Sequence, residues 1–103
     1  MEDREQLFVE LWVSLASLLR SYTAAHGLNG DRQATVELGE QRITVRHAAK
    51  WLDLQRSAAE VRWVRENGSS GEIELTEAGT LRSETGDEAM DLAAELWARE
   101  LMQ

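Results

Sequence analysis

The stretch ITVRHAAKWLDLQRSAAEVRWVREN, residues 43–67, decides between two folds. Its paired alanines, its leucines and its many arginines suggest a helix-turn-helix, whose second helix reads DNA. Alternation favours a different interpretation. Within the stretch, apolar residues occur in pairs separated by a single residue: Ile43/Val45, Leu52/Leu54 and Val61/Trp63. This period of two is typical of strands that have one buried and one solvated face.

The helix-turn-helix interpretation meets a difficulty in its second helix. That helix must bury apolar side chains at positions that fall here on Ala59 and Arg62. Burying an unpaired arginine is costly, so we expect strands. A nucleic-acid-binding regulator acting through the basic segment 42–65 stays open as an alternative. The basic residues of this segment are Arg42, Arg46, Lys50, Arg56, Arg62 and Arg65.

The same alternation extends beyond the stretch on both sides. Val36/Leu38 precede it and Ile73/Leu75 follow it, and turn residues such as NGSSG (67–71) separate the pairs. A turn at residues 77–79 leads into a short sixth strand near Leu81. Because short links join neighbouring antiparallel strands, we predict a five-stranded, possibly six-stranded, antiparallel meander.

Both ends of the chain show helical spacing. Residues 4–25 carry an apolar stripe that ends at His26-Gly27, with a turn at Asn29-Gly30. Thr85 to Glu88 fits the T-x-x-E capping box of a second helix. The stripe that follows consists of Ala89, Met90, Ala93, Trp97 and Leu101. Asp87, Asp91 and Glu95 recur on the opposite side, where we expect a solvated face.

These elements predict the fold class. We expect an α+β two-layer sandwich: an N-terminal helix, the antiparallel meander and a C-terminal helix, with both helices on one face of the sheet and a single domain over residues 1–103. Trp12, Trp63 and Trp97 should meet in the core. Trp51 stands where the alternation changes phase, so it marks a bulge, points inward or is exposed. If exposed, it is the best candidate for a contact with a partner.

Composition restricts the functions. The 103 residues carry a net charge of −8 and contain no cysteine and no proline, which excludes disulfides and thiolate chemistry. The acidic charge disfavours nucleic acid and anionic membranes as partners. The apolar segment 7–19 is too short to span a bilayer and contains Glu10. It follows acidic residues instead of a basic leader, so we expect a cytoplasmic protein.

The order of elements is similar to that of the frataxin fold, in which terminal helices flank an antiparallel sheet. LDLQRSAAEVRWVRE lies where that family has a strand, a short link and a strand carrying a Trp, whereas the family's Gln-x-Pro link is absent. The resemblance implies an acidic, iron-binding partner of iron–sulfur assembly. The acidic residues of the first helix that this role would use are Glu2, Asp3, Glu5 and Glu10.

The residues themselves predict no active site. The two histidines, His26 and His47, have no neighbours at a recognised metal-ligand spacing, and no serine lies in a nucleophile elbow. We therefore expect no catalytic, cofactor-binding or metal-binding residue and no enzyme. The favoured function is a non-enzymatic interaction module that binds a protein partner or a second copy of itself, with Trp51 as the possible contact.

Overall fold

The computed structural model describes residues 2–27 and 34–103, with side chains from residue 4 onward within these ranges. The predicted Asn29-Gly30 turn and the side chains of Glu2 and Asp3 lie outside the described part. The elements are α1 (Glu2–His26), β1 (Thr35–Leu38), β2 (Arg42–His47), β3 (Lys50–Ser57), β4 (Glu60–Arg65), β5 (Ser70–Leu75), β6 (Thr80–Ser83), β7 (Gly86–Ala89) and α2 (Met90–Leu101).

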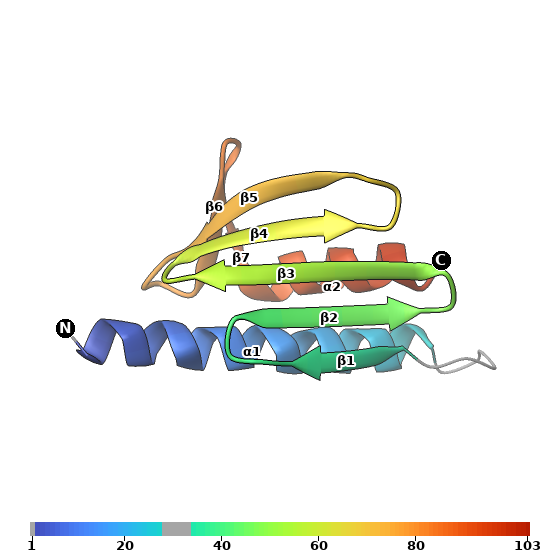
Figure 1. Cartoon of the computed structure of the whole chain (residues 1–103), viewed down its shortest axis with the longest axis horizontal. Helices are drawn as coiled ribbons and strands as arrows, with labels where there is room; N and C mark the ends of the chain where they lie inside the picture. The colour runs from blue at the N-terminus through green and yellow to red at the C-terminus, as the bar shows by residue number, and fades with distance from the viewer. Residues whose placement is uncertain (1, 28–33) are drawn as a thin grey trace.

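The predicted two-layer α+β architecture is confirmed. The seven strands form one antiparallel sheet in chain order, and both helices lie behind it (Figure 1). α1 runs behind β1 and β2, while α2 runs behind β3 in the same direction as α1. None of the described helices is long and apolar enough to cross a membrane.

The helix-turn-helix interpretation of residues 42–65 is wrong, because these residues form β2, β3 and β4. The alanine pairs that suggested helices are the turns of two hairpins. His47 pairs with Lys50 around Ala48-Ala49, and Ser57 pairs with Glu60 around Ala58-Ala59. The first alanine of each turn has a positive φ, 56° at Ala48 and 55° at Ala58. Alanine rarely adopts this conformation, so an alanine pair does not by itself predict a turn.

The predicted capping box is also wrong. Gly86–Ala89 form a seventh strand paired with β6, and α2 begins at Met90 with no side-chain hydrogen bond at its N-cap, Ala89. Nε of Arg82 donates to Asp87 at 2.9 Å across this hairpin. All four β7 residues are exposed, so the strand has no apolar alternation. The sheet therefore has seven strands instead of the predicted five or six.

The core lies between the helices and the inner face of the sheet. Its fully buried members include Leu15 and Leu19 of α1 and Leu52 and Leu54 of β3. Trp12 is buried there as predicted, and its Nε1 donates to the carbonyl of Gly39 at 3.1 Å. Trp63 and Trp97 do not meet it in the centre: both are half-buried against the margin of the core.

Arg56 is the buried exception on the inner face. Arg56 lies within β3, and the alternation of that strand points it inward in line with Leu52 and Leu54. Its guanidinium donates to Glu5 at 3.2 Å and to the carbonyl of Ala58 at 2.9 Å. It also lies 6.0 Å from the ring centroid of Trp12. Nε of Arg56 is buried without a hydrogen-bond partner.

The acidic residues of the last helix tie it to the first. Tyr22 donates a hydrogen bond to Asp91, and Nε2 of His26 lies 2.9 Å from Oε2 of Glu95. Asp87 belongs to β7 and pairs with Arg82. Asp87 and Asp91 are exposed, as expected of a solvated face, but Glu95 is half-buried and Asp87 lies outside the helix. Asp91 and Glu95 contact α1, and Asp87 pairs with Arg82 within the β6–β7 hairpin.

Candidate interaction surfaces

Trp51 lies on the open face of the sheet, which no described helix covers. It is 37% exposed and pairs directly with Arg46 on β2. The pairing of β2 with β3 continues one to one from Arg42 to His47, so Trp51 marks no bulge. The change of phase in the alternation comes instead from the two-residue turn at Ala48-Ala49. Of the orientations that the sequence left open, the structure shows the exposed one.

A shallow hollow of about 550 Å³ surrounds this indole. Asp53 lies at its floor and is only 5% exposed. Its carboxylate accepts hydrogen bonds from Nε of Arg42 at 2.7 Å and from Nε2 of Gln55 and Oγ1 of Thr44 at 3.1 and 3.2 Å. We call these residues the Trp51 patch: Trp51, Arg42, Thr44, Arg46, Asp53 and Gln55.

The charge state of Asp53 follows from these contacts. Burial alone would raise the pKa of its carboxyl, but the hydrogen bonds from Arg42, Gln55 and Thr44 together hold that pKa below its ordinary value. Asp53 is therefore a carboxylate whose hydrogen-bonding capacity is largely used within the protein. It orients its neighbours and leaves Trp51 and Arg46 to face solvent.

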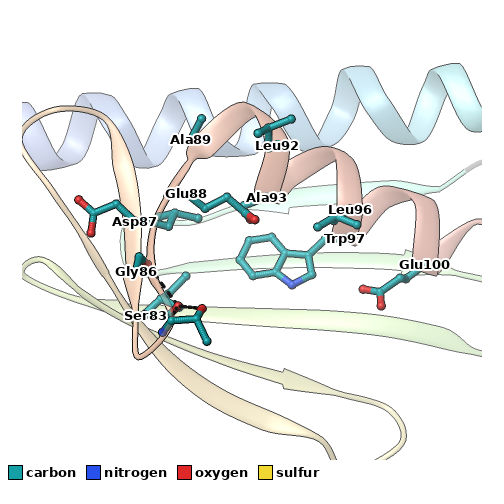
Figure 2. A pocket seen from close by; sticks show the side chains of 13 residues that line it. Ser83, Gly86, Asp87, Glu88, Ala89, Leu92, Ala93, Leu96, Trp97 and Glu100 are labelled. Atoms are coloured by element: carbon teal, nitrogen blue, oxygen red, sulfur yellow. Dashed lines mark hydrogen bonds between the residues drawn. The ribbon is translucent and has the colours of Figure 1, made fainter.

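A second hollow, of about 570 Å³, lies on the opposite side of the sheet beside α2 (Figure 2). Leu92 and Leu96 form one wall, with exposed fractions of 59% and 43%. Trp97 projects from α2 into the hollow, and Ile73 contributes from β5. We call this site the α2 groove; its apolar lining consists of Ile73, Leu81, Ala89, Leu92, Ala93, Leu96 and Trp97.

The groove exists because the two helices do not cover the whole sheet. Two helices of about 10 Å side by side cover roughly 20 Å, which is about four spacings of 4.8 Å between strands, so they do not lie behind all seven strands. Figure 1 shows β4 and β5 extending beyond the edge of α2. Trp63 and Ile73, on the inner face of these strands, are accordingly only half-buried.

Carboxylates stand around the groove. Asp87, Glu88 and Glu100 line it, and no lysine or arginine is among its described lining residues. Asp87 pairs with Arg82 and Glu100 pairs with Arg65. Glu88 lies opposite Leu81 in the β6–β7 pairing, so alternation directs it to the groove side. In Figure 2, Glu88 and Glu100 lie on either side of Trp97, and Asp87 points away.

The basic segment 42–65 does not form one surface. Arg42 pairs with Asp53 on the open face, but Arg56 and Arg65 point to the helix side and pair with Glu5 and Glu100. Arg62 lies on the open face of the sheet, opposite Gln55 and Glu72. The nucleic-acid alternative required two helices and one basic surface, whereas residues 42–65 form strands and their basic side chains are divided between the two faces of the sheet.

The residues of the iron-handling alternative are placed only in part. Glu5 contacts Arg56, and Glu10 is exposed on α1. Among the described side chains, those of residues 4–27 and 34–103, no three His, Cys, Asp or Glu group as a metal site. His47 is half-buried and its Nδ1 lies 3.1 Å from the carbonyl of Leu101. Iron handling therefore stays a prediction of the frataxin resemblance.

No family model matches the chain, and no curated protein or solved structure matches it either. The similarity to the frataxin fold is one of element order, in a sheet that has seven strands.

Sequence reasoning anticipated Trp51 but missed the α2 groove. Leu92 and Leu96 are four residues apart and lie off the stripe that was assigned to the core. A second apolar stripe on a short helix was the available signal. Which strands that helix leaves uncovered depends on the spacing of α1 and α2, which the sequence pattern does not contain.

Proposed function

We propose that the protein is a non-enzymatic interaction module that binds a protein partner in the α2 groove. The observation that carries this proposal is the exposure of Leu92 and Leu96 beside Trp97, in a concave site of about 570 Å³. Burying apolar surface stabilises an association by roughly 25 cal/mol per Å². Grooves of this kind, with apolar walls and a polar rim, are typical of protein–protein contacts.

Site-specific photocrosslinking tests the proposal. A benzophenone amino acid is introduced at position 96 in the full chain, in the cells that make the protein, and products are identified by mass spectrometry. The matched control carries the same group at position 13, because Val13 is 44% exposed on α1 and Leu96 43%. We expect a defined product from position 96 only. Equal products from both positions, or none from either, would contradict the proposal.

We propose the Trp51 patch as a second contact for a protein partner. An indole presents a large rigid surface at low entropic cost, and tryptophan and arginine are enriched where binding energy concentrates. Trp51→Ala should weaken a complex that uses this face, whereas Ser57→Ala, an exposed change on the same face of β3 but outside the Trp51 patch, should not. Equal affinities of the two variants for the crosslinked partner would remove Trp51 from the interface. We expect the protein to act in the cytoplasm.

A further inference from the structure

We infer that the occupant of the α2 groove is one amphipathic helix of a partner protein, apolar along one side and basic toward both ends. This inference rests on the proposed function and specifies the partner. It follows from the space left on the sheet, the side chains that line that space and the sign of the charges around it.

The space is that of a third helix. Helices that pack on one another or on a sheet lie about 8–10 Å apart, which is the width of two strands. α1 takes the position behind β1 and β2, and α2 that behind β3 (Figure 1). The next position in this layer is the inner face of β4 and β5. Val61 and Leu75, at one end of these two strands, are buried, but Trp63 and Ile73 are only half-buried, so the space that remains lies over these two residues.

The floor of this position is smooth and apolar. Trp63 and Gly71 are direct partners across β4 and β5. A Cβ atom on residue 71 would stand 2.6 Å from Nε1 of the indole, so the ring lies against the strand instead of standing up from it. Because the indole of Trp63 lies flat beside the half-buried Ile73, a helix can approach the sheet closely at this point.

The wall of the groove also suits a helix. Leu92 and Leu96 are four residues apart on α2, so they form a ridge of the kind that fits between the side chains of an adjacent helix. The β6–β7 hairpin stands at the N-terminal end of α2, as Figure 2 shows. At the other end Arg65 holds Glu100, with its guanidinium 5.8 Å from the centroid of Trp63.

The carboxylates that line the groove favour an occupant with positive charge. Glu88 lies just before α2, and Glu100 lies near its C-terminal end, so the two carboxylates are separated along the groove by about one helix of 12 residues, roughly 18 Å. A basic side chain near one end of a bound helix would meet Glu88, and one near the other end would share Glu100 with Arg65. A second copy of this chain is a poor occupant, because it carries a net charge of −8.

A model peptide tests the inference. The probe is a synthetic Leu/Lys peptide of about 15 residues, long enough to follow α2 at 1.5 Å per residue, with leucines at helical spacing and lysines at both ends. Its controls are the same peptide with Glu for Lys and a scrambled Leu/Lys peptide. Amide and indole NMR shifts of the protein locate the site, and Cα shifts of the labelled peptide give its bound conformation.

We expect the Leu/Lys peptide to bind as a helix and to shift Ile73, Glu88 and Trp97. Leu96→Glu should weaken it by about tenfold or more, and Glu88→Lys by a few-fold, whereas the equally exposed Val13→Glu should change affinity less than about twofold. Circular dichroism of each variant checks that it is folded. Equal binding of the Glu peptide, binding as an extended strand, or shifts confined to another surface would overturn the inference.

Two measurements separate this inference from the proposed function. If no Leu/Lys peptide binds but position 96 still crosslinks to a partner, the groove is a protein site whose occupant is not a basic helix. If light scattering shows a dimer that Leu96→Glu dissociates, the occupant is a second copy, and the inference is wrong. If position 96 does not crosslink and no Leu/Lys peptide binds, both the proposed function and the inference about its occupant are wrong.

Discussion

The indole of Trp63 lies on Gly71, its direct neighbour across β4 and β5, so closely that a Cβ atom at residue 71 would be 2.6 Å from Nε1 and 2.7 Å from Cε2. Real Cβ atoms do not approach this closely. Any larger residue at position 71 must therefore displace the ring, which lies on the inner face of β4 and stacks against the guanidinium of Arg65.

Gly71→Ala should therefore destabilise the protein by about 1–3 kcal/mol, the usual cost of overpacking, and this should outweigh the entropic gain of removing a glycine. Urea unfolding measures the change, and the indole NMR signal of Trp63 should move. Gly39→Ala is the control, since a Cβ there lies 3.4 Å from the nearest atom, the carbonyl oxygen of Arg42. Equal stability of Gly71→Ala and the native protein would show that Trp63 is free to move.

The hairpin turns give a prediction of the opposite sign. Ala48 has a φ of 56° and Ala58 one of 55°, in a region that costs alanine roughly 1 kcal/mol. Ala48→Gly should relieve this cost and raise the free energy of unfolding by about 0.5–1 kcal/mol. Ala49→Gly, in the same turn but without a positive φ, should lower it. Thermal unfolding of the two variants distinguishes the outcomes, and a destabilised Ala48→Gly would contradict the prediction.

These turns also show where prediction from the sequence ended. The strands from Val36 to Leu75 were predictable because burial of one face imposes a period of two on their apolar residues. The turn at Ala48-Ala49 was not, because tertiary pairing of β2 with β3 forces alanine into a conformation that its own preference disfavours. The change of phase at Trp51 was visible, but its cause, a two-residue turn, was not.

The last hairpin shows a second limit. Gly86–Ala89 pair with β6 through their backbones while their side chains stay exposed, so no apolar pattern marks the strand. The T-x-x-E motif therefore predicted a capping box at a place where Asp87 pairs with Arg82. The α2 groove escaped prediction for a related reason: it is defined by the strands that the helices leave uncovered.

Arg56 provides a test of the buried charge under α1. Its Nε has no partner, and its ion pair is with Glu5, whose side chain is mostly exposed. Replacing a buried ion by an apolar side chain of similar length is often neutral or stabilising. Arg56→Met should therefore keep the free energy of unfolding within about 1 kcal/mol of the native value or raise it.

Arg56→Ala should cost about 2–4 kcal/mol, because it leaves a cavity beside Trp12. Arg62→Met, on the wet face, is the control and should change stability by less than about 0.5 kcal/mol. Urea unfolding of the three variants is the measurement. Equal losses for Arg56→Met and Arg56→Ala would show that the charge of Arg56, instead of its volume, holds this end of the core together.

Asp53 should make the free energy of unfolding depend on pH in the acidic range. Hydrogen bonds from Arg42, Gln55 and Thr44 outweigh burial and hold its pKa below the ordinary value, which is about 3.9 in unfolded chains. The folded state therefore binds this proton less tightly than the unfolded state. The stability that the carboxylate contributes is fully present above about pH 4 and is lost as the pH falls through the folded pKa.

Asp53→Asn should remove this dependence. At pH 7 the variant should be less stable by about 1–3 kcal/mol, since an amide group would face the donors of Arg42 and Gln55. The difference from the native protein should shrink below about pH 4, where the native carboxylate begins to take up its proton. Urea unfolding at a series of pH values measures this.

Asp87→Asn is the matched control: its pKa is also lowered, chiefly by Arg82, but its ion pair is exposed, so its effect should be smaller and decrease with salt. If the difference in free energy of unfolding between the native protein and Asp53→Asn stays constant from pH 7 to pH 2, Asp53 stabilises the sheet through its shape and not its charge.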